Sequence, residues 1–170
     1  MKKLLNKLII IEFEDKKSQK GILINYSKDW FLIKSNPVDF ILDGYTVIKN
    51  YNVKNITTND DTELLEKAMK LKGISVDKKI HKISLKNFDS IAESINKTFG
   101  IFSLAKKRDD AIYPGKLKKL TDKKIILTWI DLKANWGKNR EFTKEKIRTI
   151  DFDTDYLVSL KLLAENNNNY

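Results

Sequence analysis

The 170-residue chain contains no cysteine and a single histidine. Without cysteine it can form no disulfide framework, no thiolate nucleophile and no cysteine zinc site, a composition typical of a reducing cytoplasm. His81 stands among lysines in "DKKIHKIS", without a nucleophile or an orienting carboxylate beside it. A general base or metal ligand requires such partners. We therefore expect a cytoplasmic protein in which His81 is a linker residue with no catalytic role.

Long apolar runs are also absent, since no segment approaches the roughly 20 residues that cross a bilayer. The opening "MKKLLNKLIIIEFEDKK" resembles the start of a secretory signal, but Asn6 and Lys7 interrupt its apolar run. No small-residue cleavage site follows it. This segment predicts a first β-strand, and we expect no association with a membrane.

Patterns that carry catalysis are missing as well. The sequence contains no phosphate-cradling glycine loop, nucleophile elbow or histidine pair. Asp151, Asp153 and Asp155 resemble the opening of a calcium loop, but Tyr156 and Leu162 stand where that loop needs glycine and glutamate. Capping of a following helix explains the same acids. We expect no enzyme, no cofactor and no metal.

Positive charge is abundant, but arginine is scarce. Lysine and arginine number 33 against 23 acids, a formal net charge of +10 that favours attraction to polyanions. Only Arg108, Arg140 and Arg148 are arginines, the residues that make bidentate and stacking contacts. The lysine charge is therefore open to two interpretations, a solvated surface or a nucleic-acid-binding face.

The most informative feature present is an internal repeat. An offset of 94 residues sets Gly21 against Gly115 without a gap. The same offset matches apolar positions: Leu23 with Leu117, Tyr26 with Leu120, Phe31 with Ile125, Leu32 with Ile126, Ile33 with Leu127, Leu42 with Trp136, Ile48 with Phe142, Val53 with Ile147 and Ile56 with Ile150. Because apolar positions coincide while polar ones differ, the two copies are predicted to share a fold without necessarily sharing a site.

Each copy is predicted to contain five short strands and a closing helix. The strands are runs of β-branched and aromatic residues broken by turn residues. In the first copy they cover residues 7–13, 20–27, 29–35, 45–50 and 53–57. The helix of the first copy is expected to have Asp60 as its N-cap and Gly73 as its end, and that of the second copy Asp153 or Asp155 as its cap. An additional helix over residues 87–98 is predicted to connect the copies.

The stretches "GILINYSKDWFLIK", "DGYTVIKNYNVKNI", "ISLKNFDSIAESINKTFGIFSL" and "IRTIDFDTDYLVSLKLLAE" together resemble a group of uncharacterised bacterial proteins with tandem Sm-like or SH3-like barrels. More distantly, each copy resembles the Sm-like RNA-binding fold. The resemblance implies a mainly β protein with α (α+β): two tandem Sm-like or SH3-like small barrels, each followed by a helix, with an extra connecting helix. The expected units are a first barrel with its helix (1–72), a linker and connecting helix (73–98), a second barrel with its helix (99–165) and a disordered tail (166–170).

The sequence departs from the Sm-like pattern where that family holds an RNA base. The positions of its aspartate and asparagine fall on Ser27 and Phe31 in copy one. The later aliphatic-arginine-glycine signature is only partly kept, as "VKN" at 53–55 and "IRT" at 147–149. The resemblance therefore implies barrel topology without that nucleotide pocket.

Aromatic residues interleaved with basic ones supply the candidate binding positions, because such residues can stack bases and neutralise phosphates, although large aromatics more often fill cores. The candidate partner-binding residues are Trp30, Tyr26, Tyr45, Lys49, Lys54, Lys138, Arg140 and Arg148. Trp30 has Lys124 as its counterpart, so it is special to copy one, and we expect Trp30→Ala to leave folding largely intact. The function expected is a non-enzymatic interaction module that binds a protein through barrel edges or the inter-barrel groove. The alternative is RNA or DNA binding on a lysine-rich face.

Overall fold

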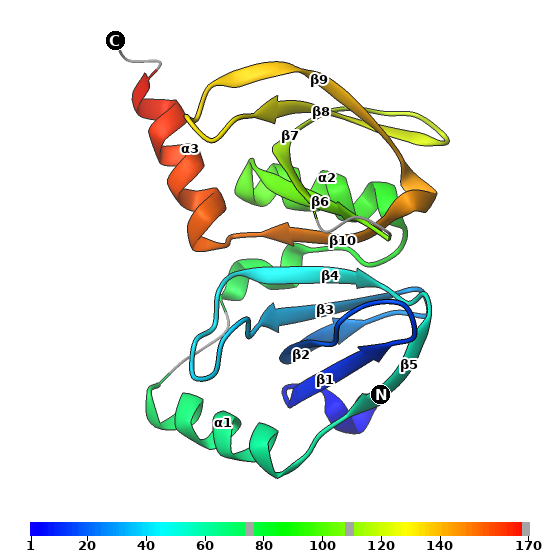
Figure 1. Ribbon diagram of the computed structural model, residues 1–170, viewed down its shortest axis with the longest axis vertical. Coiled ribbons are helices and arrows are strands. Elements are labelled where there is room, and N and C mark those ends of the chain that lie inside the picture. Colours follow the sequence, from blue (N-terminus) through cyan, green and yellow to red (C-terminus); the bar gives the residue numbers. More distant parts are fainter. Residues whose placement is uncertain (74–76, 108–110, 168–170) are drawn as a thin grey trace.

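The computed structural model describes residues 1–73, 77–107 and 111–167, and within them all strands belong to one ten-stranded antiparallel sheet (Figure 1). The strand order is β5-β1-β2-β3-β4-β10-β6-β7-β8-β9. The strands of the N-terminal half are β1 (Leu8–Phe13), β2 (Gln19–Tyr26), β3 (Trp30–Ser35), β4 (Tyr45–Lys49) and β5 (Val53–Thr57). Those of the C-terminal half are β6 (Phe102–Lys106), β7 (Ile112–Leu120), β8 (Lys124–Ile130), β9 (Trp136–Thr143) and β10 (Ile147–Phe152).

Three described helices accompany the sheet. They are α1 (Asp60–Leu71) after β5, α2 (Phe88–Phe99) before β6 and α3 (Asp155–Asn167) after β10. Short 3-10 turns lie at η1 (Lys2–Leu4), η2 (Lys78–Lys82) and η3 (Lys144–Lys146). Among the helices that the structure describes, none is both long and apolar enough to cross a bilayer. The coarse prediction of a mainly β protein with helices is confirmed.

The internal repeat is present in the pairing of the strands. Gly21 lies opposite Ser35 in β2 and β3, and Gly115 lies opposite Trp129 in β7 and β8, at the same offset of 94. The register shift after Leu23 recurs after its counterpart in β7. The β3–β4 and β8–β9 ladders also agree residue for residue at this offset. Only the first strand of each copy differs in register. Ile9 of β1 lies opposite Gly21, but Phe102 of β6 lies opposite Gly115, one residue before the position that the offset gives.

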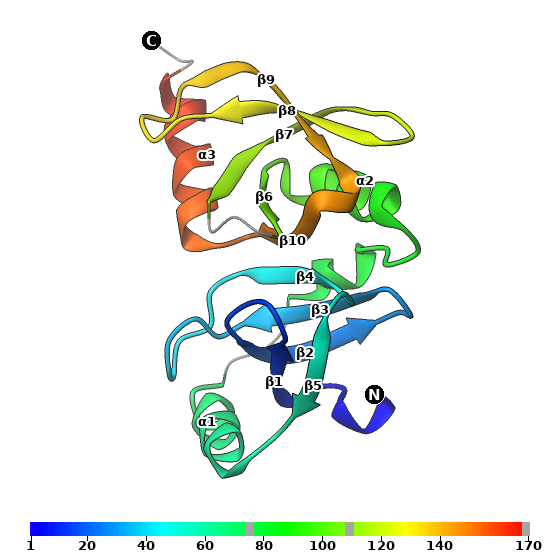
Figure 2. The same ribbon diagram turned by 45° about the vertical axis from the view of Figure 1, so that its right-hand side comes forward.

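The two halves are joined edge to edge. β4 pairs antiparallel with β10, from Ile48 opposite Thr149 to Tyr45 opposite Phe152. Figure 2 shows the halves one above the other, with β4 and β10 where they meet. Two separate barrels are not confirmed, because the strands of both copies are hydrogen-bonded into one continuous sheet.

The predicted unit boundaries at 72–73 and 98–99 stay a prediction. The helix α3 extends through Asn167, so residues 166 and 167 are helical where we expected the start of a disordered tail. Residues 168–170 of that tail lie outside the described residues.

Apolar side chains form two main cores, one within the N-terminal half and a larger one that spans both halves and the linker. The N-terminal core includes Ile11, Leu23 and Phe31. The larger core contains Leu104 and Ile125 of the second copy, with Leu117 packed against it. It also extends over the opposite face of β3 and β4, where Trp30 and Val47 pack with residues of η2 and α2. The helix α2 therefore does connect the two copies, within one residue of the range that its apolar periodicity predicted.

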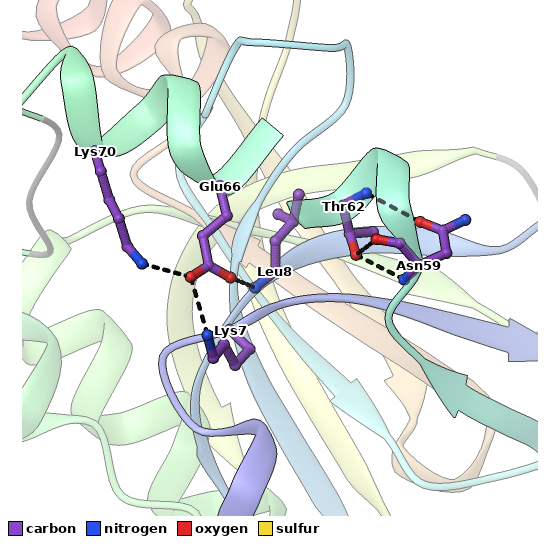
Figure 3. A network of polar contacts seen from close by, with 6 residues as sticks. All are labelled: Lys7, Leu8, Asn59, Thr62, Glu66 and Lys70. Atoms are coloured by element: carbon purple, nitrogen blue, oxygen red, sulfur yellow. Dashed lines mark hydrogen bonds and ion pairs between the residues drawn. The ribbon is translucent and has the colours of Figure 1, made fainter. Parts of the chain in front are cut away.

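Both closing helices are capped by residues other than the predicted aspartates. Asn59, and not Asp60, is the N-cap of α1, and it forms a reciprocal capping box with Thr62 (Figure 3). At α3, the Thr154 hydroxyl accepts from the Leu157 amide at 3.2 Å. Each cap lies one residue before the first helical aspartate, so the acids occupy the first turn, where the helix dipole favours negative charge.

The helix α1 is anchored to β1 by a buried carboxylate. Glu66 accepts hydrogen bonds from the Leu8 amide at 3.3 Å, from Lys70 at 2.7 Å and from Lys7 at 3.3 Å (Figure 3). Burial alone would raise the pKa of Glu66, but these donors outweigh it and hold the pKa below its ordinary value. The anchor keeps α1 against the start of β1, where Leu65 packs on Leu8.

Candidate binding surfaces at the junction and the sheet edges

Three of the eight candidate residues lie inside the protein. Trp30 is only 4% exposed, Tyr45 1% and Arg148 1%. We expected Trp30 to contact a partner and to be dispensable for folding, but it is buried, and its ring packs 6.1 Å from that of Phe88 in α2. Comparing the two copies could not reveal this burial, because α2 belongs to neither copy. The helix packs on Trp30 in the first copy, whereas the equivalent Lys124 in the second copy is exposed.

Arg148 binds the two halves together. From β10 its guanidinium donates to both carboxylate oxygens of Asp15, at 2.8 and 2.7 Å, and to the carbonyl of Tyr51 at 3.1 Å. It also lies 4.9 Å from the centre of the Phe13 ring. The hydrogen bond from Arg148 lowers the pKa of Asp15 below its ordinary value. Since its donors point inward, Arg148 is not placed to contact a partner.

Tyr45 and Lys49 belong to the same junction. The Tyr45 ring stacks on Phe152 of β10, with centroids 5.6 Å apart, and its hydroxyl accepts from the Asp77 amide at 3.1 Å. Burial raises the pKa of the Tyr45 hydroxyl. Lys49 is half-buried, with its ammonium 5.8 Å from the Trp30 ring, and burial lowers its pKa, helped by the charge of Lys107. These side chains support the sheet and do not form an open site.

The remaining four candidates are not brought together. Tyr26 is partly buried against the N-terminal core, and Lys54 is exposed on β5. Lys138 and Arg140 are exposed on β9, at the opposite end of the sheet from Lys54. Arg140 lies 4.0 Å from the centre of the Trp129 ring. No single surface of the described structure unites the eight residues.

The outermost strands present the most open backbone. β5 and β9 form the two ends of the sheet, and neither has a second strand partner among the described residues. The Lys144 amide donates to the Lys123 carbonyl, and hydrogen-bonded pairs alternate along an antiparallel ladder. The backbone groups of Asn139 and Glu141 therefore point away from β8. Five consecutive residues of β9, 137–141, are exposed, so this edge is open to another strand.

A polar pocket of about 340 Å³ lies at the junction itself. It contains a chain of short hydrogen bonds, in which the Ser35 and Thr46 hydroxyls are 2.6 Å apart and Thr46 donates to Asp151 at 2.7 Å. Burial raises the pKa of Asp151 to about 6, against the opposing effects of the Thr46 hydrogen bond and the charge of Lys16. The lining residues are Ser18, Gln19, Lys20, Ile33, Ser35, Asn36, Pro37, Asp43, Thr46, Asp151 and Thr154.

The loop between β3 and β4 forms one wall of this pocket and carries exposed apolar residues. Asn36 holds the loop by donating to the carbonyls of Val38 and Ile41, both at 2.7 Å. Val38, Phe40 and Ile41 are 59%, 44% and 54% exposed. Phe40 has a φ of 62°, a left-handed conformation that costs a residue with a side chain about 1 kcal/mol. The loop thus holds an aromatic ring at the surface against a backbone preference.

The pocket had no signal in the sequence, because the β4–β10 pairing brings Asp151 and Thr154 against residues of the N-terminal half that are more than 100 positions away. Within the described ranges, no cluster of three or more histidine, cysteine or acidic side chains is arranged to hold a metal ion. No protein-family model, curated protein or solved structure matches the chain. The resemblance to tandem Sm-like barrels therefore stays a prediction.

Proposed function

We propose that the chain is a non-enzymatic cytoplasmic interaction module that binds another protein by adding a strand to a free edge of its sheet. The observation that carries this proposal is the open β9 edge. Main-chain hydrogen bonds supply the affinity in strand addition, and alternate side chains supply the specificity. On β9, Lys138 and Arg140 are exposed beside the edge, and charged edge residues discourage indiscriminate pairing.

The junction provides an internal example of this binding mode. By the 94-residue offset β9 corresponds to β4, and β4 pairs along its length with β10. The same correspondence makes β5 the counterpart of β10. The free edge of β9 therefore corresponds to the edge of β4 that pairs with β10, and the free edge of β5 corresponds to the edge of β10 that pairs with β4.

The proposal also concerns the fold of each half. We propose that the two halves are Sm-like barrels fused through β4 and β10. The identical strand order in each half supports this, as do the matching register shifts in β2 and β7.

The test is selection of peptides of about eight residues, a typical strand length, on the full chain and on an edge-blocked variant. Asn139→Pro removes an amide that points to the free edge, so it should abolish strand addition while leaving β8–β9 pairing in place. Asn139→Ala removes the same side chain but keeps the amide, and it should bind as the unmodified chain does.

Bound peptides should also slow hydrogen exchange at the amides of Asn139 and Glu141. Retention of the selected peptides by Asn139→Pro, with the β8–β9 ladder intact, would contradict strand addition. So would a selection that returns no peptide whose binding depends on this edge.

A lysine-rich surface on the C-terminal half supports nucleic-acid binding as a second candidate. Residues 116–124 contain five lysines and one aspartate. The ammonium of Lys116 lies 4.3 Å from the centre of the Trp136 ring, and the same half contains the Arg140–Trp129 pair. Retention of single-stranded RNA and DNA should then fall steeply with salt, and binding that is unaffected by salt would exclude this candidate.

A further inference from the structure

Two buried side-chain oxygens of the junction pocket accept no hydrogen bond within the described residues. They are Gln19 Oε1 and Asn36 Oδ1. Asn36 is only 3% exposed, and its amide donors are used by the loop. Lys20, the pocket's cationic side chain, donates to Asp39 at 2.8 Å. Buried acceptors without donors are costly, so the pocket is suited to a ligand that donates several hydrogen bonds.

The charged residues that line the pocket also favour a ligand that donates hydrogen bonds. Two carboxylates line it, Asp43 and Asp151, against one lysine that Asp39 already neutralises. Asp43 accepts from the Asp155 amide at 2.7 Å, which fixes its place at the pocket wall. Lys16 adds a further positive charge near Asp151. Carboxylates thus outnumber lysines two to one in the pocket lining, in a chain whose net charge is +10.

From this geometry we infer that the pocket binds a guanidinium or alkylammonium group, with Asp151 as its counter-ion. A guanidinium presents donors along several directions in one plane, which suits acceptors supplied by different strands. Asp151 is already oriented by the hydroxyl of Thr46. Ile33 and Pro37 also line the pocket and provide apolar contact for an alkyl stem. A volume of about 340 Å³ is at the lower end of ligand pockets and accommodates one such side chain.

The group has two possible sources, a small amine or an arginine or lysine of a protein partner. A partner chain would meet the exposed Val38, Phe40 and Ile41, which lie in the loop whose residues Asn36, Pro37 and Asp43 line the pocket. This inference does not depend on strand addition, because the pocket is formed by β2, β3, β4 and β10 and not by the free edges. Asn139→Pro should leave it unchanged.

The experiment is a titration of the full chain followed by backbone amide NMR shifts, with methylguanidinium as the probe and the neutral N-methylurea as its matched control. Methylguanidinium should give saturable shifts at pocket residues, and N-methylurea should not. Asp151→Asn keeps an acceptor for Thr46 but removes the charge, and it should weaken binding at least about tenfold, the usual effect of losing a charge-assisted hydrogen bond. Asp122→Asn, which changes an exposed turn acid outside the pocket, should have no effect.

If Asp151→Asn does not fold, Gln19→Met serves in its place, because it removes one buried acceptor at the partly exposed start of β2. Equal binding of methylguanidinium and N-methylurea would overturn the inference, and so would unchanged binding by the folded variants. A pocket that gives no saturable shift with methylguanidinium is a water-filled structural cavity, and this too refutes it. An arginine peptide flanked by apolar residues that binds more tightly than methylguanidinium identifies the source as a protein side chain.

Discussion

Replacing Arg148 tests whether the two halves are held together by their polar junction as well as by the β4–β10 ladder. Arg148→Met keeps an unbranched stem in a site that is 1% exposed but removes the guanidinium. The variant loses the bidentate contact with Asp15 and the hydrogen bond to the Tyr51 carbonyl. Removing one partner of a buried ion pair typically costs about 3–5 kcal/mol of stability, because the other charge is left unpaired.

The expected loss is smaller here. The side chain of Asp15 is 34% exposed, so water can solvate its carboxylate once Arg148 is gone. We expect Arg148→Met to lower the free energy of unfolding by about 2 kcal/mol, below that range. Urea denaturation at pH 7 measures this, with Asp15→Asn and the double variant completing a double-mutant cycle.

Two further readouts connect the loss to the junction. Amide exchange at β4 and β10 should accelerate more than exchange at β2 and β3. Arg148 lowers the pKa of Asp15, so the stability gained from the pair is present above the unfolded pKa of about 3.9 and is lost as the pH falls through the lower folded pKa. The destabilisation by Arg148→Met should therefore shrink on acidification. A variant within about 0.5 kcal/mol of the parent at pH 7, the range of ordinary surface changes, would refute this role for Arg148.

Three other changes give distinct outcomes. Trp30→Ala should destabilise the protein by about 3–5 kcal/mol, measured by urea denaturation, because it empties a core position against Phe88, whereas an unchanged midpoint would place Trp30 outside the core. Asn59→Ala should cost about 1 kcal/mol by removing the cap of α1, seen in the same assay, and no loss would show that the capping box is dispensable. The folded pKa of Asp151 is raised from 3.8 to about 6, so the parent should lose stability as the pH rises through this window. Asp151→Asn should abolish that loss, and equal pH profiles for the two proteins would contradict it.

Much of the local structure follows from neighbouring residues. The strands of the first copy were predicted within one residue at every end, because alternating β-branched and aromatic runs bounded by turn residues depend on short-range geometry. The 94-residue offset also holds in the strand register, since Gly21 and Gly115 both lie where an added Cβ would come within 2.5 Å of a neighbouring carbonyl oxygen. The helix caps were each wrong by a small shift, since several polar residues at the start of a helix are competent to cap it.

The candidate site was predicted far less well, and the reason is physical. An aromatic or basic residue can contact a ligand only if no other segment buries it. In this chain the segments that bury such residues are distant in sequence. Arg148 is paired with a residue 133 positions away and Thr46 with one 105 positions away. Neither the copy-to-copy alignment nor local composition contains that information.

The strands and helices, their repetition and many core positions can be predicted from the amino-acid sequence alone, because these depend on side-chain periodicity within a few residues. Three features became visible only in the folded chain: the two copies share one sheet, α2 packs on Trp30, and Asp151 lines a pocket at the junction of the halves. Burial and charge pairing depend on contacts between segments that are distant in sequence. The pairing of β4 with β10 creates such contacts, and no local sequence pattern relates the residues involved.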